Sequence, residues 1–237
     1  RELLRATNTS TATLATTVKA GWVSIGQRFE LRDAVAESAP LAEPTFCLNE
    51  EQAAALAKVD EAVAAAKFGV TLLFGVSGSG KTEVYIRAIR GVIEHGGQAI
   101  LLVPEIVLTT QLVARLASRF SDVALMHSAM TEAQRSVMWR QIADGRKPVI
   151  IGTRSAVFAP CPRLQLICVD EEQESSFKNL QAPRFHVRDV AIMRAKKLGI
   201  PVVLGSATPS LETWYRSGTR ADYQRLMLPH RVRSLPL

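Results

Sequence analysis

A glycine-rich loop that ends in lysine and threonine lies at residues 75–82 of this sequence. Within "FGVSGSGKTEVY" it matches G-x-x-x-x-G-K-[ST] at every fixed position, after the apolar run "VTLLF" and before a helix-forming run. Glycines let backbone N–H groups surround phosphate oxygens, and a helix N-terminus adds the positive end of its dipole. The loop therefore predicts a site for a nucleoside triphosphate. The residues expected around its phosphates are Gly75, Val76, Ser77, Gly78, Ser79, Gly80, Lys81 and Thr82.

Specific roles can be assigned to two residues of this loop and to two acidic residues downstream of it. Lys81 is expected to reach the β- and γ-phosphates, and the hydroxyl of Thr82 to bind Mg²⁺. The apolar run "LQLICV" ends in Asp170 and Glu171, where a second Mg²⁺ ligand should emerge from a strand. Asp170 is predicted to be that ligand, directly or through water, and Glu171 to be the base that orients the attacking water. Adjacent acids could instead form a solvated turn, but the phosphate loop upstream favours the metal site.

Three further loops, "VPEIVLTTQ", "GTRSAVFAP" and "GSATPS", follow apolar runs. The carboxyl ends of strands are where α/β sheets bind ligands. Ser206 and Thr208 offer hydroxyls to the γ-phosphate region, whereas Thr109, Arg154 and Ser155 offer donors for nucleic-acid phosphates. Each loop could also be a simple turn, because serine and threonine are common helix caps.

Apolar runs and amphipathic runs alternate from residue 48 onward. Strands are expected at residues 70–74, 98–104, 123–128, 148–153, 164–172 and 201–208. Helices are expected at residues 50–67, 82–97, 108–120, 131–145 and 186–199. Near-continuous apolar strands separated by helices predict an α/β fold, in which a parallel sheet is covered on both faces.

The first 34 residues have a different pattern. "RELLRATN" and "TSTATLATTVKAG" read as two helices, and "WVSIGQRFEL" reads as two short strands, which together outline a winged-helix-like module. A helical cap on the next domain is an equally good interpretation. We expect the module at residues 1–34, a linker at 35–47, the phosphate-binding lobe at 48–218, and a connection toward a second lobe at 219–237.

Composition limits the class of protein. The chain has 237 residues, 47% of them hydrophobic, which suffices for one large domain or a domain with a small module. It has no run of about eighteen apolar residues, so no membrane segment is expected. Three scattered cysteines predict reduced thiols in the cytoplasm, and a net charge of +7 is compatible with a polyanionic partner. The sequence lacks an initiating Met, so we expect it to begin inside a longer protein.

The motifs follow one another in the order "GVSGSGKTEVY", "LLVPEIVLTTQ", "MHSAMTEAQR", "IIGTRSAVFAP", "VDEEQESSFK", "PRFHVRDVAIMRA" and "VVLGSATPS". This order resembles superfamily 2 helicases, and within them the PriA family of bacterial replication-restart helicases. The resemblance runs from about residue 48 to the last residues and implies a RecA-like lobe. It also implies an ATP-driven 3′–5′ DNA translocase that unwinds lagging-strand arms at stalled forks. The partners it implies are branched DNA with single-strand/duplex junctions, replication-restart proteins and single-strand-binding proteins.

The resemblance adds further site residues. Gln52 is similar to the family's glutamine that contacts adenine, although on its own it reads as a solvent-facing helix residue. Residues 175–185 match an aromatic-rich loop that links DNA contact to hydrolysis. There Phe177 and Phe185 could stack on bases while Lys178 and Arg184 touch phosphates, or the two phenylalanines could pack beneath a loop.

Two departures from the family bear on activity. Gln173 stands where the family usually has histidine, but its amide still offers a donor and an acceptor between the γ-phosphate and the "GSAT" loop. The family's arginine finger and its cysteine-rich zinc insertion belong to a second lobe that this sequence does not contain. The resemblance therefore implies zinc only in that further part, and very low activity for this chain alone.

Other functions remain open from the sequence. A DNA-binding scaffold that recruits replication proteins without unwinding is one, and a different superfamily 2 repair translocase is another. A metabolic phosphate-loop kinase is poorly supported, because it would have no use for the "GTRSA" and "GSATPS" loops.

Overall fold

The structure, a computed structural model, describes residues 11–20, 22, 47–105, 116 and 119–232. The chain divides into two units, residues 1–32 and 33–237. In the first unit, α2 (Thr11–Lys19) coincides with the second helix expected of the winged-helix-like module. The first helix and both strands expected there lie outside the described residues, so the winged helix stays a prediction.

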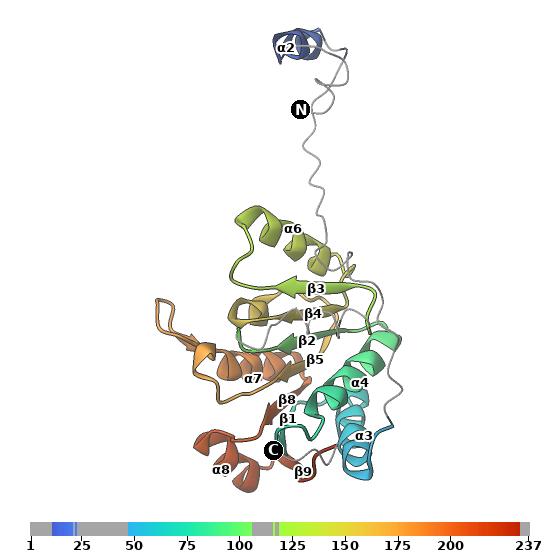
Figure 1. The fold of residues 1–237 in the computed structure, drawn as a ribbon, viewed down its shortest axis with the longest axis vertical. Helices are drawn as coiled ribbons and strands as arrows, with labels where there is room; N and C mark the ends of the chain where they lie inside the picture. The colour runs from blue at the N-terminus through green and yellow to red at the C-terminus, as the bar shows by residue number, and fades with distance from the viewer. Residues whose placement is uncertain (1–10, 21, 23–46, 106–115, 117–118, 233–237) are drawn as a thin grey trace. The chain divides into compact units, whose positions relative to one another are not determined.

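Seven parallel strands form the sheet of the second unit, in the order β3-β4-β2-β5-β8-β1-β9 (Figure 1). Their bounds are β1 (Gly69–Gly75), β2 (Gln98–Leu102), β3 (Val123–Met126), β4 (Val149–Gly152), β5 (Leu164–Val169), β8 (Pro201–Ser206) and β9 (Tyr223–Leu228). The six strands expected from apolar runs are confirmed. The seventh, β9, pairs with β1, so the sheet continues past residue 218, where the lobe was expected to end.

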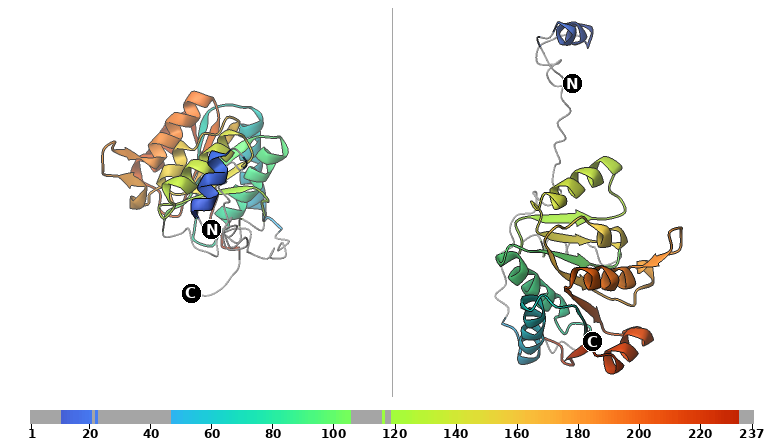
Figure 2. Two further views of the ribbon diagram at one scale, coloured as in Figure 1. Left: turned by 90° about the horizontal axis from the view of Figure 1, so that it is seen from above. Right: turned by 180° about the vertical axis from the view of Figure 1, so that it is seen from behind.

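The strands are apolar throughout because both faces of the sheet are covered. Every residue of β2 and of β8 is buried. Helices α3 (Glu50–Ala64) and α4 (Lys81–Glu94) pack on one face, where their buried side chains share a core cluster with Phe120. Helices α6 (Glu132–Ala143) and α7 (Val187–Leu198) pack on the other face (Figures 1 and 2).

Local sequence explains where the helices begin and end. Asn49 and Thr131 start α3 and α6, each as part of a capping box with a glutamine three residues later. Helix α7 ends at Gly199, whose φ of 69° is a left-handed conformation that glycine adopts at little cost. Helix α8 (Leu211–Thr219), which the sequence did not predict, begins after the cap Ser210. Most of the helix expected at residues 108–120 lies outside the described residues.

A short hairpin projects from the sheet between β5 and α7 (Figure 1). Strands β6 (Lys178–Asn179) and β7 (Phe185–His186) pair antiparallel, after the short 3-10 helix η2 (Ser175–Phe177). A second 3-10 helix, η1 (Arg154–Phe158), follows β4. Among the described residues, none of the helices has the length and apolar character needed to cross a membrane.

Candidate active site

The site forms where three neighbouring strands end. In the sheet order β5, β8 and β1 lie side by side, although β1 precedes the other two by about a hundred residues in the chain. All are parallel, so their carboxyl ends meet at one edge of the sheet. The phosphate loop follows β1, the acidic turn follows β5 and the "GSATPS" loop follows β8. The three predicted motifs are therefore brought together by strand order.

The conformation of the phosphate loop requires glycine at two points. Gly80 caps α4 with φ of 84°, and a Cβ there would lie 2.2 Å from Nε2 of Gln52. A Cβ on Gly75 would lie 2.5 Å from Oγ of Ser79 and 2.9 Å from Cβ of Leu228. Side chains at either position would collide with neighbours, so the backbone curls closely only with glycine.

Lys81 lies over this loop. Its side chain is 7% exposed, its Nζ donates to the carbonyl of Gly75 at 2.7 Å, and it lies 3.9 Å from Oε1 of Glu171. Thr82 follows it in the first turn of α4 and is partly exposed. The ammonium group of Lys81 is thus close to the carboxylate of Glu171, which the sequence predicts to be the general base.

Gln52 contacts the phosphate loop from α3. Its Nε2 donates to the carbonyl of Ser79 at 2.8 Å, and its Oε1 accepts from the backbone N of Asn49 at 3.0 Å. The residue is 2% exposed, which contradicts the interpretation of a solvent-facing glutamine. Contact with adenine stays a prediction, and the observed role of Gln52 is to tie α3 to the loop.

The acidic turn after β5 is held from several directions. The backbone N of Asp170 donates to the carbonyl of Leu102 at 2.8 Å, and the buried hydroxyl of Tyr85 lies 3.3 Å from Oδ1 of Asp170. Glu171 adopts φ of 48°, a left-handed conformation that is uncommon outside glycine. These contacts are inconsistent with a freely solvated turn.

Burial, helped by the neighbouring charge of Glu171, raises the pKa of the Asp170 carboxyl to about 6, although Lys81 opposes the shift. The raised pKa shows that neither water nor nearby positive charge fully compensates the ionised carboxylate. A divalent cation bound here would favour the ionised form. Oγ of Ser79 is buried without a hydrogen-bond partner among the described residues, and a phosphate oxygen could pair with it. The residues present therefore fit a nucleoside triphosphate with Mg²⁺.

A path of hydrogen bonds joins the acidic turn to the loop after β8. Nε2 of Gln173 donates to Oε2 of Glu171 at 2.9 Å, and Oε1 of Gln173 accepts from Oγ of Ser206 at 2.6 Å. The same Ser206 oxygen accepts from the backbone N of Thr208 at 2.9 Å. Donor and acceptor of the Gln173 amide are both used, between Glu171 and the "GSATPS" loop, and a link from Gln173 to a γ-phosphate stays a prediction.

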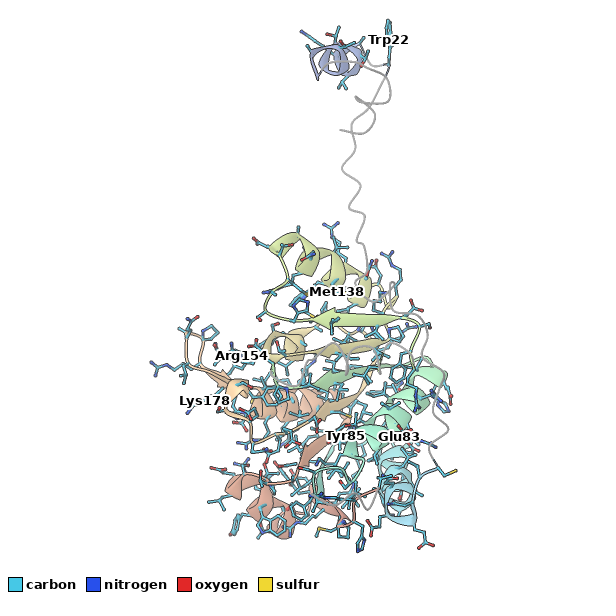
Figure 3. All side chains as sticks on the ribbon, viewed as in Figure 1. Trp22, Glu83, Tyr85, Met138, Arg154 and Lys178 are labelled. Carbon is cyan, nitrogen blue, oxygen red and sulfur yellow. The ribbon has the colours of Figure 1, made fainter. Side chains whose placement is uncertain are left out.

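The residues predicted to contact DNA fall into three groups. Thr109 lies outside the described residues. Arg154 begins η1, beside Ser155, and its Nη1 donates to the carbonyl of Lys178 at 3.4 Å (Figure 3). Lys178 and Arg184 are both exposed on the hairpin, and a hollow of about 520 Å³ lies against it. The hollow is lined by Lys178, Asn179, Leu180, Arg184, Phe185 and His186.

The two phenylalanines of this segment differ. Phe177 is 1% exposed in the core cluster with α7, so its burial favours the packing alternative over stacking on a base. Phe185 is partly exposed on β7, and its ring meets that of Phe158 edge-on with centroids 5.2 Å apart. Only Phe185 retains a ring surface beside the hollow.

Sequence reasoning missed Tyr85, whose buried hydroxyl contacts Asp170, and the buried ion pair between Glu172 and Arg188 that supports the acidic turn. Arg188 could have been found, because it stands in the first turn of α7, where the helix dipole disfavours a cation. A cation there indicates a specific acidic partner. Glu172, at 2.9 Å from Nη1 of Arg188, is the buried partner, and Asp189 lies 3.2 Å from its Nε.

Comparisons with known proteins agree with this geometry. The family model of the DEAD/DEAH box helicases matches residues 49–216. The chain is 42% identical over 98% of its length to the replication restart protein PriA of Bacillus subtilis, and 40% identical over its whole length to that of Synechocystis. These matches confirm the resemblance to the PriA family. The chain spans less than a third of the length of these relatives, 29% and 28% respectively.

Solved structures show the same fold. RecG bound to a three-way DNA junction is similar with a TM-score of 0.59, at 24% identity, over 84% of this chain and 25% of RecG. The helicase MrfA bound to DNA is similar with a TM-score of 0.55, at 14% identity, over 78% of this chain and 27% of MrfA. The sheet of residues 69–228 is thus a RecA-like lobe, and the chain belongs to the DEAD/DEAH box helicase family.

Proposed function

We propose that this chain is the first motor lobe of an ATP-dependent 3′–5′ DNA helicase that acts at stalled replication forks in replication restart. One observation carries the proposal: contacts run without a break from Lys81 through Glu171, Gln173 and Ser206 to Thr208. A domain that only held nucleotide would not need to connect the phosphate loop to the end of β8. A motor needs such a connection, because hydrolysis must change the conformation of another segment.

ATP would be held by the phosphate loop, with Lys81 at the β- and γ-phosphates and Thr82 and Asp170 at Mg²⁺. Hydrolysis of the bound nucleotide supplies the free energy for movement along DNA. Tyr85 holds Asp170 from behind through its hydroxyl. Gln52 and Gly80 fix the shape of the loop, so the phosphate-binding N–H groups are in place before nucleotide binds.

Glu171 would be the general base. Its Oε2 accepts from Gln173, so Oε1, which faces Lys81, is the oxygen left to take a proton from water. Gln173 orients the Glu171 carboxylate and also bonds Ser206, so a shift of the carboxylate would be transmitted to Ser206. The base and the loop that senses nucleotide state are therefore positioned by one amide.

DNA would contact the hairpin and η1. Arg154, Lys178 and Arg184 supply positive charge beside the hollow, and Phe185 supplies an aromatic face. Phosphates and the faces of bases are present in every sequence, so contacts of this kind suit a motor that must travel over any sequence. Single-strand-binding and replication-restart proteins are the partners that the PriA resemblance supports, and zinc is assigned only to the further part of the protein.

The test is DNA-stimulated ATP hydrolysis by the full-length protein, with unwinding of a forked DNA measured in parallel. Wild type should hydrolyse ATP faster with DNA and separate the strands, and Lys81→Ala should do neither. Stimulation without unwinding would support the scaffold alternative instead. Equal affinity of wild type and Lys81→Ala for a fluorescent ADP analogue would contradict the nucleotide site.

The same proposal predicts how residues 1–237 behave alone. In helicases of this family ATP lies between two lobes, and an arginine of the second lobe stabilises the transferring phosphoryl group. Loss of such an arginine costs about 10³–10⁵ in rate. The isolated chain should therefore bind nucleotide but hydrolyse it barely above background, and fast DNA-stimulated turnover by the chain alone would contradict the two-lobe model.

A further inference from the structure

The side chain of Glu172 is completely buried and has donors on three sides. Oε2 accepts from Nη1 of Arg188 at 2.9 Å and lies 3.2 Å from Oγ1 of Thr213. Oε1 accepts from the backbone N of Ser210 at 2.7 Å. Nη1 of Arg188 also donates to Oγ of Ser210 at 2.7 Å. We refer to Glu172, Arg188, Ser210 and Thr213 as the clamp.

The clamp joins three segments that are distant in sequence. Glu172 lies in the acidic turn, between the proposed base Glu171 and the bridging residue Gln173. Arg188 lies in the first turn of α7, directly after β7 of the hairpin. Ser210 ends the "GSATPS" loop and caps α8. One carboxylate thus holds together the catalytic turn, the base of the hairpin and the loop that senses nucleotide state.

Stability alone is a poor explanation for these residues. Burying an ion pair costs so much hydration that apolar side chains of similar size are often as stabilising or more so. Arg188 also lies at the end of α7 where the helix dipole opposes a cation. What the ion pair supplies, and an apolar pair would not, is a set of directed hydrogen bonds that fixes the angle between the segments.

The clamp lies directly between the hairpin and the Gln173–Ser206 bridge. On one side, Nδ1 of His186 in β7 accepts from the backbone N of Arg188 at 3.2 Å. On the other side, Glu172 is adjacent to Gln173 in the chain, and its backbone N donates to the carbonyl of Gly205, which precedes Ser206, at 3.0 Å. A displacement of β7 must therefore move Arg188, and through Glu172 it reaches the residues that hold Glu171.

We propose that Arg188 is a positioning residue that transmits occupation of the hairpin by DNA to the Gln173–Ser206 bridge, and so sets how far DNA stimulates ATP turnover. The inference rests on the proposed function, since it requires DNA on the hairpin and hydrolysis at the phosphate loop. It assigns Arg188 no contact with nucleotide or DNA. Its effect is on the coupling between the two sites.

The test compares full-length wild type with Arg188→Met, which keeps the length of the side chain and removes its charge and hydrogen bonds. We expect hydrolysis without DNA and the affinity for single-stranded DNA to stay close to wild type. DNA stimulation should fall by about 5- to 150-fold, the usual range of coupling between two sites. Stimulation equal to that of wild type overturns the proposal, and so does a loss of DNA affinity that accounts for the whole effect.

Two further variants separate positioning from a general loss of stability. Arg194→Met is the matched control, because Arg194 also lies in α7 and donates to the carbonyls of Val157 and Ala159, away from the clamp. It should lose stability but keep its stimulation at saturating DNA, where any weaker contact of η1 with DNA has no effect, and an equal loss of stimulation there overturns the proposal. Glu172→Gln combined with Arg188→Met should recover stability without recovering stimulation, whereas recovery of both would show a purely structural role.

If Arg188→Met does not fold, Arg188→Lys keeps the charge near Glu172 but loses the planar guanidinium and the bond from its Nε to Asp189, and reduced stimulation is again the expected result. Failure of the proposed function gives a different result, in which wild type itself shows no DNA-stimulated hydrolysis. Stimulated wild type with equally stimulated Arg188 variants contradicts the inference alone.

Discussion

Gln173 connects two chemically different groups with a single amide. It donates to Glu171 and accepts from Ser206, at 2.9 and 2.6 Å. A neutral imidazole also offers one donor and one acceptor, so glutamine can make the bridge expected of the histidine usual in the PriA family. An amide does not titrate near neutral pH, however, so this bridge keeps its donor and acceptor when the pH changes. The Gln173 amide therefore makes this connection without a titration of its own.

Removing the carboxylate of Glu171 tests its role as the base. Glu171→Gln keeps the size of the side chain but cannot accept a proton, so ATP turnover by the full-length protein should fall by about 10²–10⁴-fold. Nucleotide affinity, measured with a fluorescent ADP analogue, should stay close to wild type because Lys81 and the phosphate loop are unchanged. Glu174→Gln is the matched control, since within the part of the chain that the structure describes the Glu174 carboxylate accepts only from Oγ of the neighbouring Ser175. Equal losses in the two variants would disprove the assignment.

Gly205 gives a second prediction at this scale. A Cβ there would lie 1.4 Å from Oη and 2.7 Å from Cζ of Tyr85, whose ring is fully buried and has no room to withdraw. Gly205→Ala should therefore lower the free energy of unfolding by about 1–3 kcal/mol, the usual cost of overfilling a core. Chemical denaturation of the protein measures it. Gly218→Ala in α8 is the control, because its nearest neighbour lies 3.5 Å from the added Cβ. The same loss in both would show that Tyr85 is not the constraint.

The sequence predicts residues that belong to one continuous motif and misses those whose partners are distant. Lys81, Asp170 and Glu171 follow from local patterns that place a strand, a turn and specific side chains in order. Glu172 and Arg188 are 16 positions apart, and Ser210 is 38 positions from Glu172, so no local pattern joins them. Only the strand order, which sets β5 beside β8, brings these side chains into contact.

At the scale of elements, some strands could be predicted from the sequence and others could not. The buried strands are readable because covering both faces demands an unbroken apolar run, as in β8. Strand β9 lies at the edge of the sheet, where most of its residues are only half-buried and the sequence "YQRLML" lacks such a run. Strands β6 and β7 have two residues each, too few for any periodicity to appear. Burial on both faces, and not strand propensity, is what made the fold predictable.

The hairpin segment offers a prediction about its two phenylalanines. Phe177→Ala should lower the free energy of unfolding by about 3–5 kcal/mol, because its ring fills the core beneath the hairpin. Phe185→Ala should leave stability nearly unchanged and weaken binding of single-stranded DNA by about 1–3 kcal/mol, the loss expected for one stacked base. Thermal unfolding and fluorescence anisotropy measure the two effects. Early melting of Phe185→Ala with normal DNA binding would show that its contact with Phe158 is structural.

Across the lobe, the proposed nucleotide site and the proposed DNA contact are separated in space but joined through the chain. The phosphate loop and the acidic turn lie at the carboxyl ends of β1 and β5, which are separated in the sheet only by β8. The hairpin projects beyond the sheet and begins only a few residues after the acidic turn (Figures 1 and 2). The hairpin that reaches outward is therefore the direct continuation of the chain after the acidic turn. Binding at its outer end can act on hydrolysis without a movement of the whole sheet.

The positive charge of the molecule gives the last prediction. The chain carries a net charge of +7, and Arg154, Lys178 and Arg184 are the residues proposed to neutralise phosphates. Affinity of the full-length protein for DNA should fall with salt, with a slope of log K against log[salt] of about 0.7–0.9 for each phosphate neutralised. Replacing Arg184 with alanine should reduce that slope by about one phosphate and weaken binding to all sequences alike. Lys197→Ala removes the same charge from an exposed position at the end of α7, away from the hairpin, and should leave the slope unchanged. If the two variants change the slope equally, the effect comes from net charge, and the hairpin is not the contact.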